Sequence, residues 1–86
     1  MYSVRLLPQA QALFARADRP LAKKLARCFE QLEQNPHYHP NIRPLSGSLK
    51  DYYRFRVGDH RVVYSIDERE RVVVVTIIAH RRKAYD

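Results

Sequence analysis

The segment 53–64 constrains the fold of this chain more than any other part of it. Two stretches of alternating polar and apolar residues meet at Gly58-Asp59, a step suited to a tight β-hairpin turn. With these two residues as the loop, the cross-strand pairs are Val57 with His60, Arg56 with Arg61, Phe55 with Val62, and Tyr53 with Tyr64. Side chains alternate between the faces of a strand, so one face of the hairpin is apolar and aromatic. The other face carries Arg54, Arg56 and Arg61.

The three arginines on one hairpin face indicate an anion-binding surface. Arg56 stands directly opposite Arg61, and like charges in that position cost stability unless an anion lies between them. Guanidinium groups on one side of a sheet, with a core on the other, are well suited to hold phosphate. The alternative is a solvated outer face. Three arginines without an acidic residue on so short a face favour the phosphate site.

Length and composition favour one small domain with a hydrophobic core. The chain has 86 residues, 45% of them hydrophobic, which suffices for a single core. One cysteine excludes an intrachain disulfide framework, and Cys28 lies at helical spacing among leucines, as expected of a core residue. Neither a signal-peptide pattern nor an apolar run of membrane-spanning length is present. We therefore expect a soluble protein of the cytoplasm.

The charge balance predicts a polyanionic partner. Sixteen Lys and Arg residues against nine Asp and Glu give a net charge of +7, and twelve of the sixteen are arginine. Such an excess on a small domain is typical of proteins that bind nucleic acid, a ribonucleoprotein or an acidic protein. Arginine also favours forked phosphate contacts over the point charge of lysine.

The N-terminal half predicts a strand followed by two helices. Residues 2–6 alternate weakly, and Pro8 begins a short helix at 8–16. Asp18 and Pro20 suit the start of a second helix. Its apolar positions recur at helical spacing up to about residue 34: Leu21, Leu25, Cys28, Phe29 and Leu32.

The remaining residues predict a connector and three strands. Residues 37–50 are mostly polar with two prolines and a glycine, and strands are expected at 51–57, 60–67 and 71–79. The order β-α-α-β-β-β predicts an α+β fold, in which a two-helix hairpin packs on one face of a mainly antiparallel sheet.

Three motifs, taken in order, resemble the RelE/ParE toxin superfamily of type II toxin–antitoxin systems. They are Pro44-Leu45-Ser46-Gly47, the hairpin block Tyr53-Arg54-Phe55-Arg56-Val57-Gly58-Asp59-His60-Arg61-Val62-Val63-Tyr64, and the closing His80-Arg81-Arg82-Lys83-Ala84-Tyr85. The resemblance covers essentially the whole chain as one RelE-like domain, 1–86. Its RelE-like branch implies a ribosome-dependent endoribonuclease that cleaves mRNA in the A site. Its ParE-like branch implies a DNA gyrase inhibitor without a nuclease site.

The nuclease branch of the resemblance implies a set of site residues that this chain fills. By position, the hairpin basics correspond to Arg54 and Arg56, the arginine after the turn to Arg61, the arginine after the last strand to Arg81, and the C-terminal tyrosine to Tyr85. Tyr85 is placed to stack on a nucleobase, or alternatively to close the core. Further RNA contacts are expected from Lys50, Arg82 and Lys83, for which solvated charge is the alternative. The complete set favours the nuclease.

One departure from the family pattern concerns proton transfer. The typical nuclease has lysines at the first two hairpin positions, where this chain has arginines. RNA cleavage of this type needs a group that takes the 2′-hydroxyl proton, and arginine is a poor acceptor. Either Arg56 orients the hydroxyl while charge stabilisation supplies the rate, or a histidine moves the proton. His80, next to Arg81, is the favoured histidine, and His60 at the turn is expected to be structural.

The resemblance also implies partners and the absence of a cofactor. A cognate acidic antitoxin, the ribosome and mRNA are the expected partners, with operator DNA contacted only through the antitoxin and no membrane. His37 and His39 flank Tyr38, but a His-x-His pair without further ligands is weak support for zinc, so we expect metal-free cleavage. A third hypothesis is an inactive member of the family that binds its antitoxin and serves only as a corepressor.

Overall fold

The hairpin predicted around Gly58-Asp59 lies at the centre of the sheet. In the computed structural model, which describes residues 1–80, it joins β3 (Tyr53–Val57) to β4 (His60–Asp67). The register is the predicted one, with Val57 opposite His60 and Arg56 opposite Arg61. Gly58 has a φ of +57°, a left-handed conformation that glycine adopts without strain. The predicted pairing is therefore confirmed.

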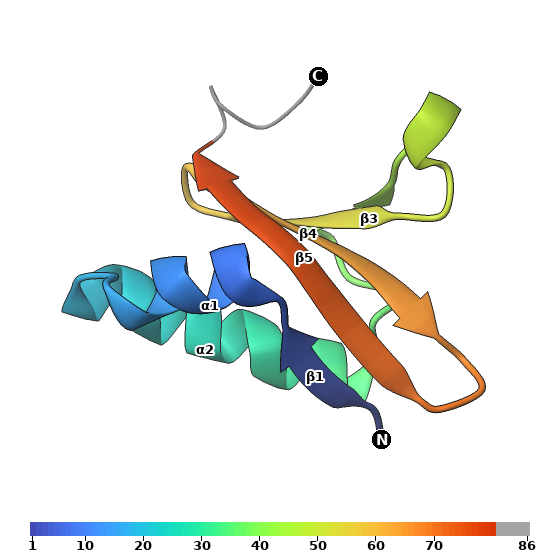
Figure 1. The fold of residues 1–86 in the computed structure, drawn as a ribbon, viewed down its shortest axis with the longest axis horizontal. Coiled ribbons are helices and arrows are strands. Elements are labelled where there is room, and N and C mark those ends of the chain that lie inside the picture. The colour runs from blue at the N-terminus through green and yellow to red at the C-terminus, as the bar shows by residue number, and fades with distance from the viewer. Residues whose placement is uncertain (81–86) are drawn as a thin grey trace.

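Three further strands complete a five-stranded sheet in the order β1-β5-β4-β3-β2. β5 (Val72–His80) pairs antiparallel with β4, and β1 (Ser3–Leu6) pairs with β5 in parallel. β2 (Ile42–Pro44) pairs antiparallel with β3 at the other edge. Figure 1 shows the long β4–β5 pair running diagonally between the two edge strands.

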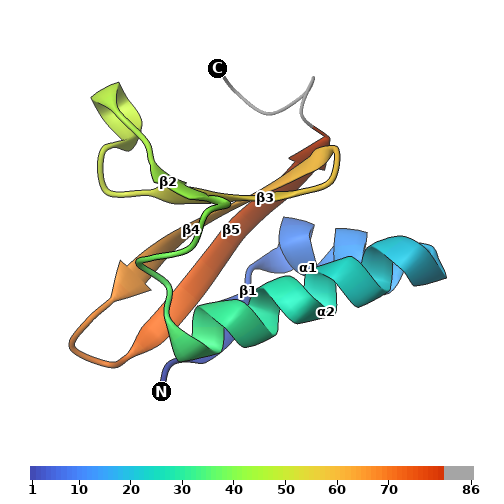
Figure 2. The same cartoon turned by 180° about the vertical axis from the view of Figure 1, so that it is seen from behind.

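Both helices cover one face of the sheet, as predicted (Figures 1 and 2). α1 (Pro8–Ala15) starts at a proline, and α2 (Arg19–Gln34) starts after Asp18, whose carboxylate accepts a hydrogen bond from the Leu21 amide at 3.0 Å. α2 ends just before Asn35-Pro36. No helix within residues 1–80 is long and apolar enough to span a bilayer.

The hydrophobic core lies between the helices and the inner face of the sheet. The largest fully buried side chains of its helices and strands come from α2, β4 and β5: Leu25, Leu32, Val62, Tyr64, Val73, Val75 and Ile78. Cys28 is part of this core, as expected. Burial raises the pKa of its thiol to about 12, so Cys28 is neutral at physiological pH.

A side-chain amide replaces a strand where β1 ends. The Leu7 amide donates to the Val75 carbonyl, and beyond it no strand within residues 1–80 pairs with β5 on that side. Gln9 of α1 takes over: its Nε2 donates to the Ile78 carbonyl at 2.8 Å, and its Oε1 accepts from the Ile78 amide at 2.9 Å. These two hydrogen bonds hold the C-terminal end of β5 beside α1.

The connector predicted at 37–50 is partly wrong. It contains strand β2, paired with β3 through Ile42, and a single 3₁₀ turn, η1 (Gly47–Leu49), which stands off the sheet on the side away from the helices (Figures 1 and 2). Three residues between two prolines give no usable alternation, so the strand has no sequence signal of its own. The other elements lie within two residues of their predicted bounds.

Candidate functional site

Two cross-strand pairs of arginines lie on the outer face of the sheet, on β2, β3 and β4. Arg56 faces Arg61 across β3–β4, as predicted, and Arg54 faces Arg43 across β2–β3. We call Arg43, Arg54, Arg56 and Arg61 the arginine face. Arg43 and Arg56 are exposed, while Arg54 and Arg61 are half-buried. The sequence analysis missed Arg43 because β2 was not predicted.

The loop before β2 fixes the middle of the arginine face. The Asn41 carbonyl accepts from Arg54 Nη1 at 3.1 Å and from the Arg56 amide at 3.0 Å. One carbonyl therefore holds β3 against the loop and orients the Arg54 guanidinium. Arg54 and Arg56 are two residues apart on β3, so their side chains project from the same face of the sheet.

A small hollow at the hairpin turn gathers the groups best suited to bind an anion. It has a volume of about 120 Å³ and is lined by Arg56, Gly58, His60 and Arg61. None of these described lining residues is acidic. Two guanidinium groups beside a glycine, where no side chain blocks the backbone, form a suitable site for a phosphate.

His60 and His80 lie together at this end of the molecule, but on the face that the helices cover. They are cross-strand partners, and their rings meet edge to face with centroids 5.5 Å apart. Both line a second hollow of about 260 Å³ with residues of α2 and the turn, among them Asp18, Lys24 and Asp59. His80 thus lies on the face opposite the arginine face, and its predicted part in proton transfer stays a prediction.

A β-bulge explains the position of His80. Val63 pairs with Ile77 and Tyr64 with Val75, so Thr76 of β5 has no partner on β4. Because of this extra residue, each side chain of β5 after Thr76 points to the face opposite the one that strict alternation would give it. Ile78 is fully buried and Ile77 is 37% exposed, and His80 shares the inner face with Ile78.

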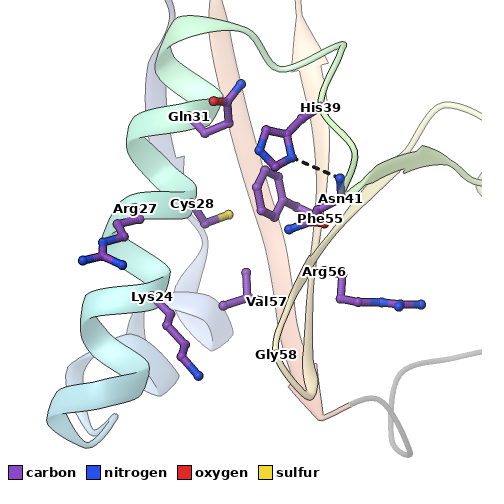
Figure 3. A pocket seen from close by; sticks show the side chains of 10 residues that line it. All are labelled: Lys24, Arg27, Cys28, Gln31, His39, Asn41, Phe55, Arg56, Val57 and Gly58. Carbon is purple, nitrogen blue, oxygen red and sulfur yellow. Dashed lines mark hydrogen bonds between the residues drawn. The ribbon is translucent and has the colours of Figure 1, made fainter.

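Figure 3 shows a third hollow between α2 and β3, of about 330 Å³. Cys28, Phe55 and Val57 form its apolar floor, and the Lys24 side chain extends toward the Gly58 turn. Arg56 points away from α2, toward the arginine face, and so contributes little charge inside this hollow (Figure 3). The hairpin turn is therefore the place where all three hollows meet, since Gly58 lines each of them.

The other histidines have structural partners. His37 Nε2 lies 2.7 Å from Glu68 Oε2, and the Tyr2 hydroxyl donates to Glu68 Oε1 at 2.7 Å. His39 Nδ1 accepts from the Asn41 amide at 3.0 Å, and its ring stacks on Phe55. Among residues 1–80, no group of three His, Cys, Asp or Glu side chains is placed to hold a metal ion.

The remaining predicted site residues are Lys50 and those of the C-terminal segment. Lys50 is exposed and directly follows η1. Arg81, Arg82, Lys83 and Tyr85 lie outside the described residues, and their roles stay predictions.

Comparison with known proteins assigns the family. Residues 4–85 match the family described as the ParE toxin of type II toxin–antitoxin system, parDE. The chain belongs to this family. The toxin is also similar to the Methanocaldococcus jannaschii protein RelE4, with 25% identity over 99% of this chain and 92% of the relative. These matches confirm the superfamily indicated by the sequence motifs.

Solved structures confirm the RelE-like fold of the toxin. The archaeal RelE–RelB complex from Pyrococcus horikoshii OT3 superposes with a TM-score of 0.81 at 24% identity, covering 96% of this chain and 98% of that one. The isolated Escherichia coli RelE toxin gives 0.79 at 18% identity, covering 93% and 84%. At these identities the likeness is one of fold.

Proposed function

We propose that this toxin is a ribosome-dependent endoribonuclease that cleaves mRNA in the ribosomal A site. The observation that carries the proposal is the hollow at the hairpin turn, where Arg56 and Arg61 face each other beside Gly58. A phosphodiester between the two guanidinium groups would offset their repulsion.

The chemistry assigned to the arginine face is stabilisation of the reacting phosphate. In RNA cleavage of this type, the 2′-oxygen attacks the neighbouring phosphorus and the 5′-oxygen leaves. The pentacoordinate phosphate gains negative charge, and forked donors fixed before the reaction are an effective way to stabilise it. We assign Arg56 and Arg61 to this phosphate, and Arg54 and Arg43 to the phosphates that precede or follow it along the strand.

The C-terminal residues extend this assignment through the family resemblance. Arg81 would add a third guanidinium to the reacting phosphate, and Tyr85 would stack on a base of the cut codon, a contact worth about 1–3 kcal/mol. Arg82, Lys83 and Lys50 would bind flanking or ribosomal RNA phosphates. No metal or cofactor is assigned a role.

A cognate acidic antitoxin is the proposed partner that neutralises the toxin. The similar RelE of Pyrococcus horikoshii was solved in complex with RelB, and a net charge of +7 suits an acidic partner. Operator DNA would be bound only through that antitoxin. The site of action would be the cytoplasm, where ribosomes translate mRNA.

The experiment is brief induction of the toxin without antitoxin, followed by mapping of mRNA 5′ ends. Wild type is compared with Arg61→Ala and with Arg69→Ala, which removes the same charge from the exposed β4–β5 turn. We expect in-frame cuts within translated codons for wild type and Arg69→Ala, and none for Arg61→Ala. Arrest with intact mRNA would refute the nuclease.

Gyrase inhibition is the second candidate, because the family that the chain matches is described by the ParE toxin. In that case arrest would come with DNA breaks and an SOS response. Absence of arrest by the wild type would instead support the corepressor hypothesis.

A further inference from the structure

The backbone of Asn41 is hydrogen-bonded on two sides. Its carbonyl accepts from Nη1 of Arg54, a member of the arginine face, at 3.1 Å. The same carbonyl accepts from the Arg56 amide at 3.0 Å, which ties the loop to β3. The Asn41 amide donates to Nδ1 of His39 at 3.0 Å. The Arg54 guanidinium is therefore connected to the His39 ring through a single backbone residue.

The His39 ring is itself held in place. It stacks on the ring of Phe55, with centroids 4.9 Å apart and an interplanar angle of 28°, as Figure 3 shows. Phe55 belongs to β3 and is buried in the core. The His39 carbonyl also accepts from the Ile42 amide, at the start of β2, at 2.9 Å. A ring fixed by a core side chain gives the Asn41 amide an acceptor in a defined position.

The bond between Asn41 and His39 has the pattern of an Asx turn, made with an imidazole. In an Asx turn, the side-chain oxygen of Asn or Asp accepts from the backbone amide two residues further on. Asn35 makes this contact in the same loop, since its Oδ1 accepts from the His37 amide at 2.9 Å. At His39 the ring nitrogen Nδ1 takes the place of that oxygen. Nδ1 accepts only while it carries no proton, which places the ring proton on Nε2.

We propose that His39 is a positioning residue of the arginine face and orients Arg54 through the backbone of Asn41; this inference rests on the nuclease proposed above. In that reaction, Arg54 is assigned to a phosphate that flanks the scissile one. The His39 ring gives the Asn41 amide its acceptor, and the Asn41 carbonyl accepts from the Arg54 guanidinium. His39 lines the hollow between α2 and β3, so it acts on the bound RNA only through these contacts.

The effect of His39 is one of orientation and not of charge. Arg54 keeps its positive charge whether or not Asn41 is held, so it still attracts phosphate. A guanidinium forms two parallel hydrogen bonds to a phosphate only in a suitable orientation. RNA should therefore still bind to a variant without the acceptor, but the strand is less well placed for the reaction at Arg56 and Arg61. Small displacements of a bound substrate have large effects on rate.

The test compares two substitutions that separate the acceptor of His39 from its stacking. His39→Phe keeps a ring against Phe55 and loses the acceptor, whereas His39→Asn loses the ring and keeps an acceptor for the Asn41 amide. Single-turnover cleavage of mRNA on purified ribosomes should be about 10- to 100-fold slower for His39→Phe. His39→Asn should recover most of that loss. The matched control is His37→Phe in the same loop, because His37 contacts Glu68, and its cleavage rate should equal that of wild type.

Side-chain NMR of the free proteins gives a readout that needs no catalysis. In wild type, the His39 ring should carry its proton on Nε2, and this measurement depends on no variant being folded. The guanidinium signals of Arg54 should shift in His39→Phe and stay near their wild-type positions in His39→Asn and His37→Phe. A ring that only stabilised the loop would not produce this difference between the two His39 variants.

Several outcomes would overturn the inference. They are a wild-type His39 ring with its proton on Nδ1, unmoved Arg54 signals or an unchanged cleavage rate in a folded His39→Phe, and equal losses of rate in both His39 variants. If wild type cuts no mRNA on ribosomes, the proposed function itself fails and the inference fails with it. Since the other outcomes are read against a wild type that cleaves, the two failures are distinguished.

Discussion

The two ends of the β4–β5 pair contain the same residue types in opposite electrostatic settings. One end lies at the Gly58-Asp59 turn, where the hollows are lined by Arg56, Arg61, His60 and His80. Within the described part of the chain, no acidic side chain lines the hollow between Arg56 and Arg61. At the other end, His37 and Tyr2 both bond to Glu68, and the Arg71 guanidinium lies 4.3 Å from the centroid of the Tyr2 ring. We call these the open end and the closed end.

The difference between the two ends separates function from scaffold. At the closed end, the Glu68 carboxylate contacts Tyr2, just before β1, and His37 of the α2–β2 loop. The backbone of Arg71 has a φ of +58° in the turn. Such a conformation costs about 1–3 kcal/mol and persists only where its neighbours determine it. At the open end, cationic side chains gather around a hollow that no acidic residue lines within the described part of the chain.

The largest expected effect comes from comparing an Arg→Ala variant at one end with an Arg→Ala variant at the other. Arg56→Ala at the open end should lower the rate of translation-coupled mRNA cleavage by about 10²- to 10³-fold, because it removes a preorganised donor to the reacting phosphate. Arg71→Ala at the closed end should keep the rate within about twofold and lower stability instead. Cleavage on purified ribosomes and thermal unfolding measure the two quantities. Equal losses of cleavage rate in both variants would show that the open end and the closed end do not differ in function.

The second prediction concerns the buried hydroxyl that anchors the closed end. Tyr64 is fully buried, and its hydroxyl donates to the Pro36 carbonyl at 2.7 Å. Tyr64→Phe leaves that carbonyl without its partner and should lower the free energy of unfolding by about 1–3 kcal/mol. Urea denaturation measures the loss, and Tyr38→Phe, at an 80% exposed position, is the control with no effect. Cleavage at 25 °C should be unchanged in both.

A smaller effect is expected from the carboxylate at the closed end. Glu68→Gln weakens a half-exposed ion pair with His37 and should cost less than about 1 kcal/mol. The hydrogen bond to Glu68 is also the main reason why the pKa of Tyr2 lies above its usual 10.0, so that pKa should fall in the variant. Tyrosine titration by NMR measures it, with Glu70→Gln in the same turn as the control. A Tyr2 pKa that does not move would rule out the contact.

The last prediction concerns the core between the two ends and applies only at alkaline pH. Burial raises the pKa of Cys28 from 9.0 to about 12, so the folded chain keeps a proton that the unfolded chain loses above pH 9. The stabilisation is present below pH 9 and is lost as the pH rises toward 12. The fall in stability over this range should be smaller in Cys28→Ala than in wild type. Parallel curves for the two proteins would show that the thiol does not titrate there.

The sequence predicted the parts of this fold that depend on local patterns. The hairpin register follows from alternation and a two-residue loop, and α2 from an N-cap and a 3.6-residue period. Most of the arginine face was predicted for the same reason. Arg43 was missed because a three-residue strand exists only through its pairing with β3.

The position of His80 could not be predicted from the sequence. β5 consists mainly of valine and isoleucine, so both of its faces are apolar. The extra residue at Thr76 therefore cannot be recognised from the order of polar and apolar residues. Strict alternation from buried Val73 and Val75 would turn His80 outward, and the bulge turns it inward. The pairing of His37 with Glu68 was equally hidden, because it joins residues 31 positions apart through tertiary contacts alone.

The parallel pairing of β1 with β5 also governs when this protein can become a toxin. Ser3 pairs with Val72 and Leu6 with Val75. The first strand to be synthesised can therefore pair only after β5, the last strand of the sheet, has been made. Contacts so distant in sequence close slowly and only in a nearly finished chain. A nascent or truncated product that lacks β5 has no partner for β1, and the core loses Val73, Val75 and Ile78. Folding of the sheet, and any activity that needs the folded sheet, therefore follows the synthesis of β5.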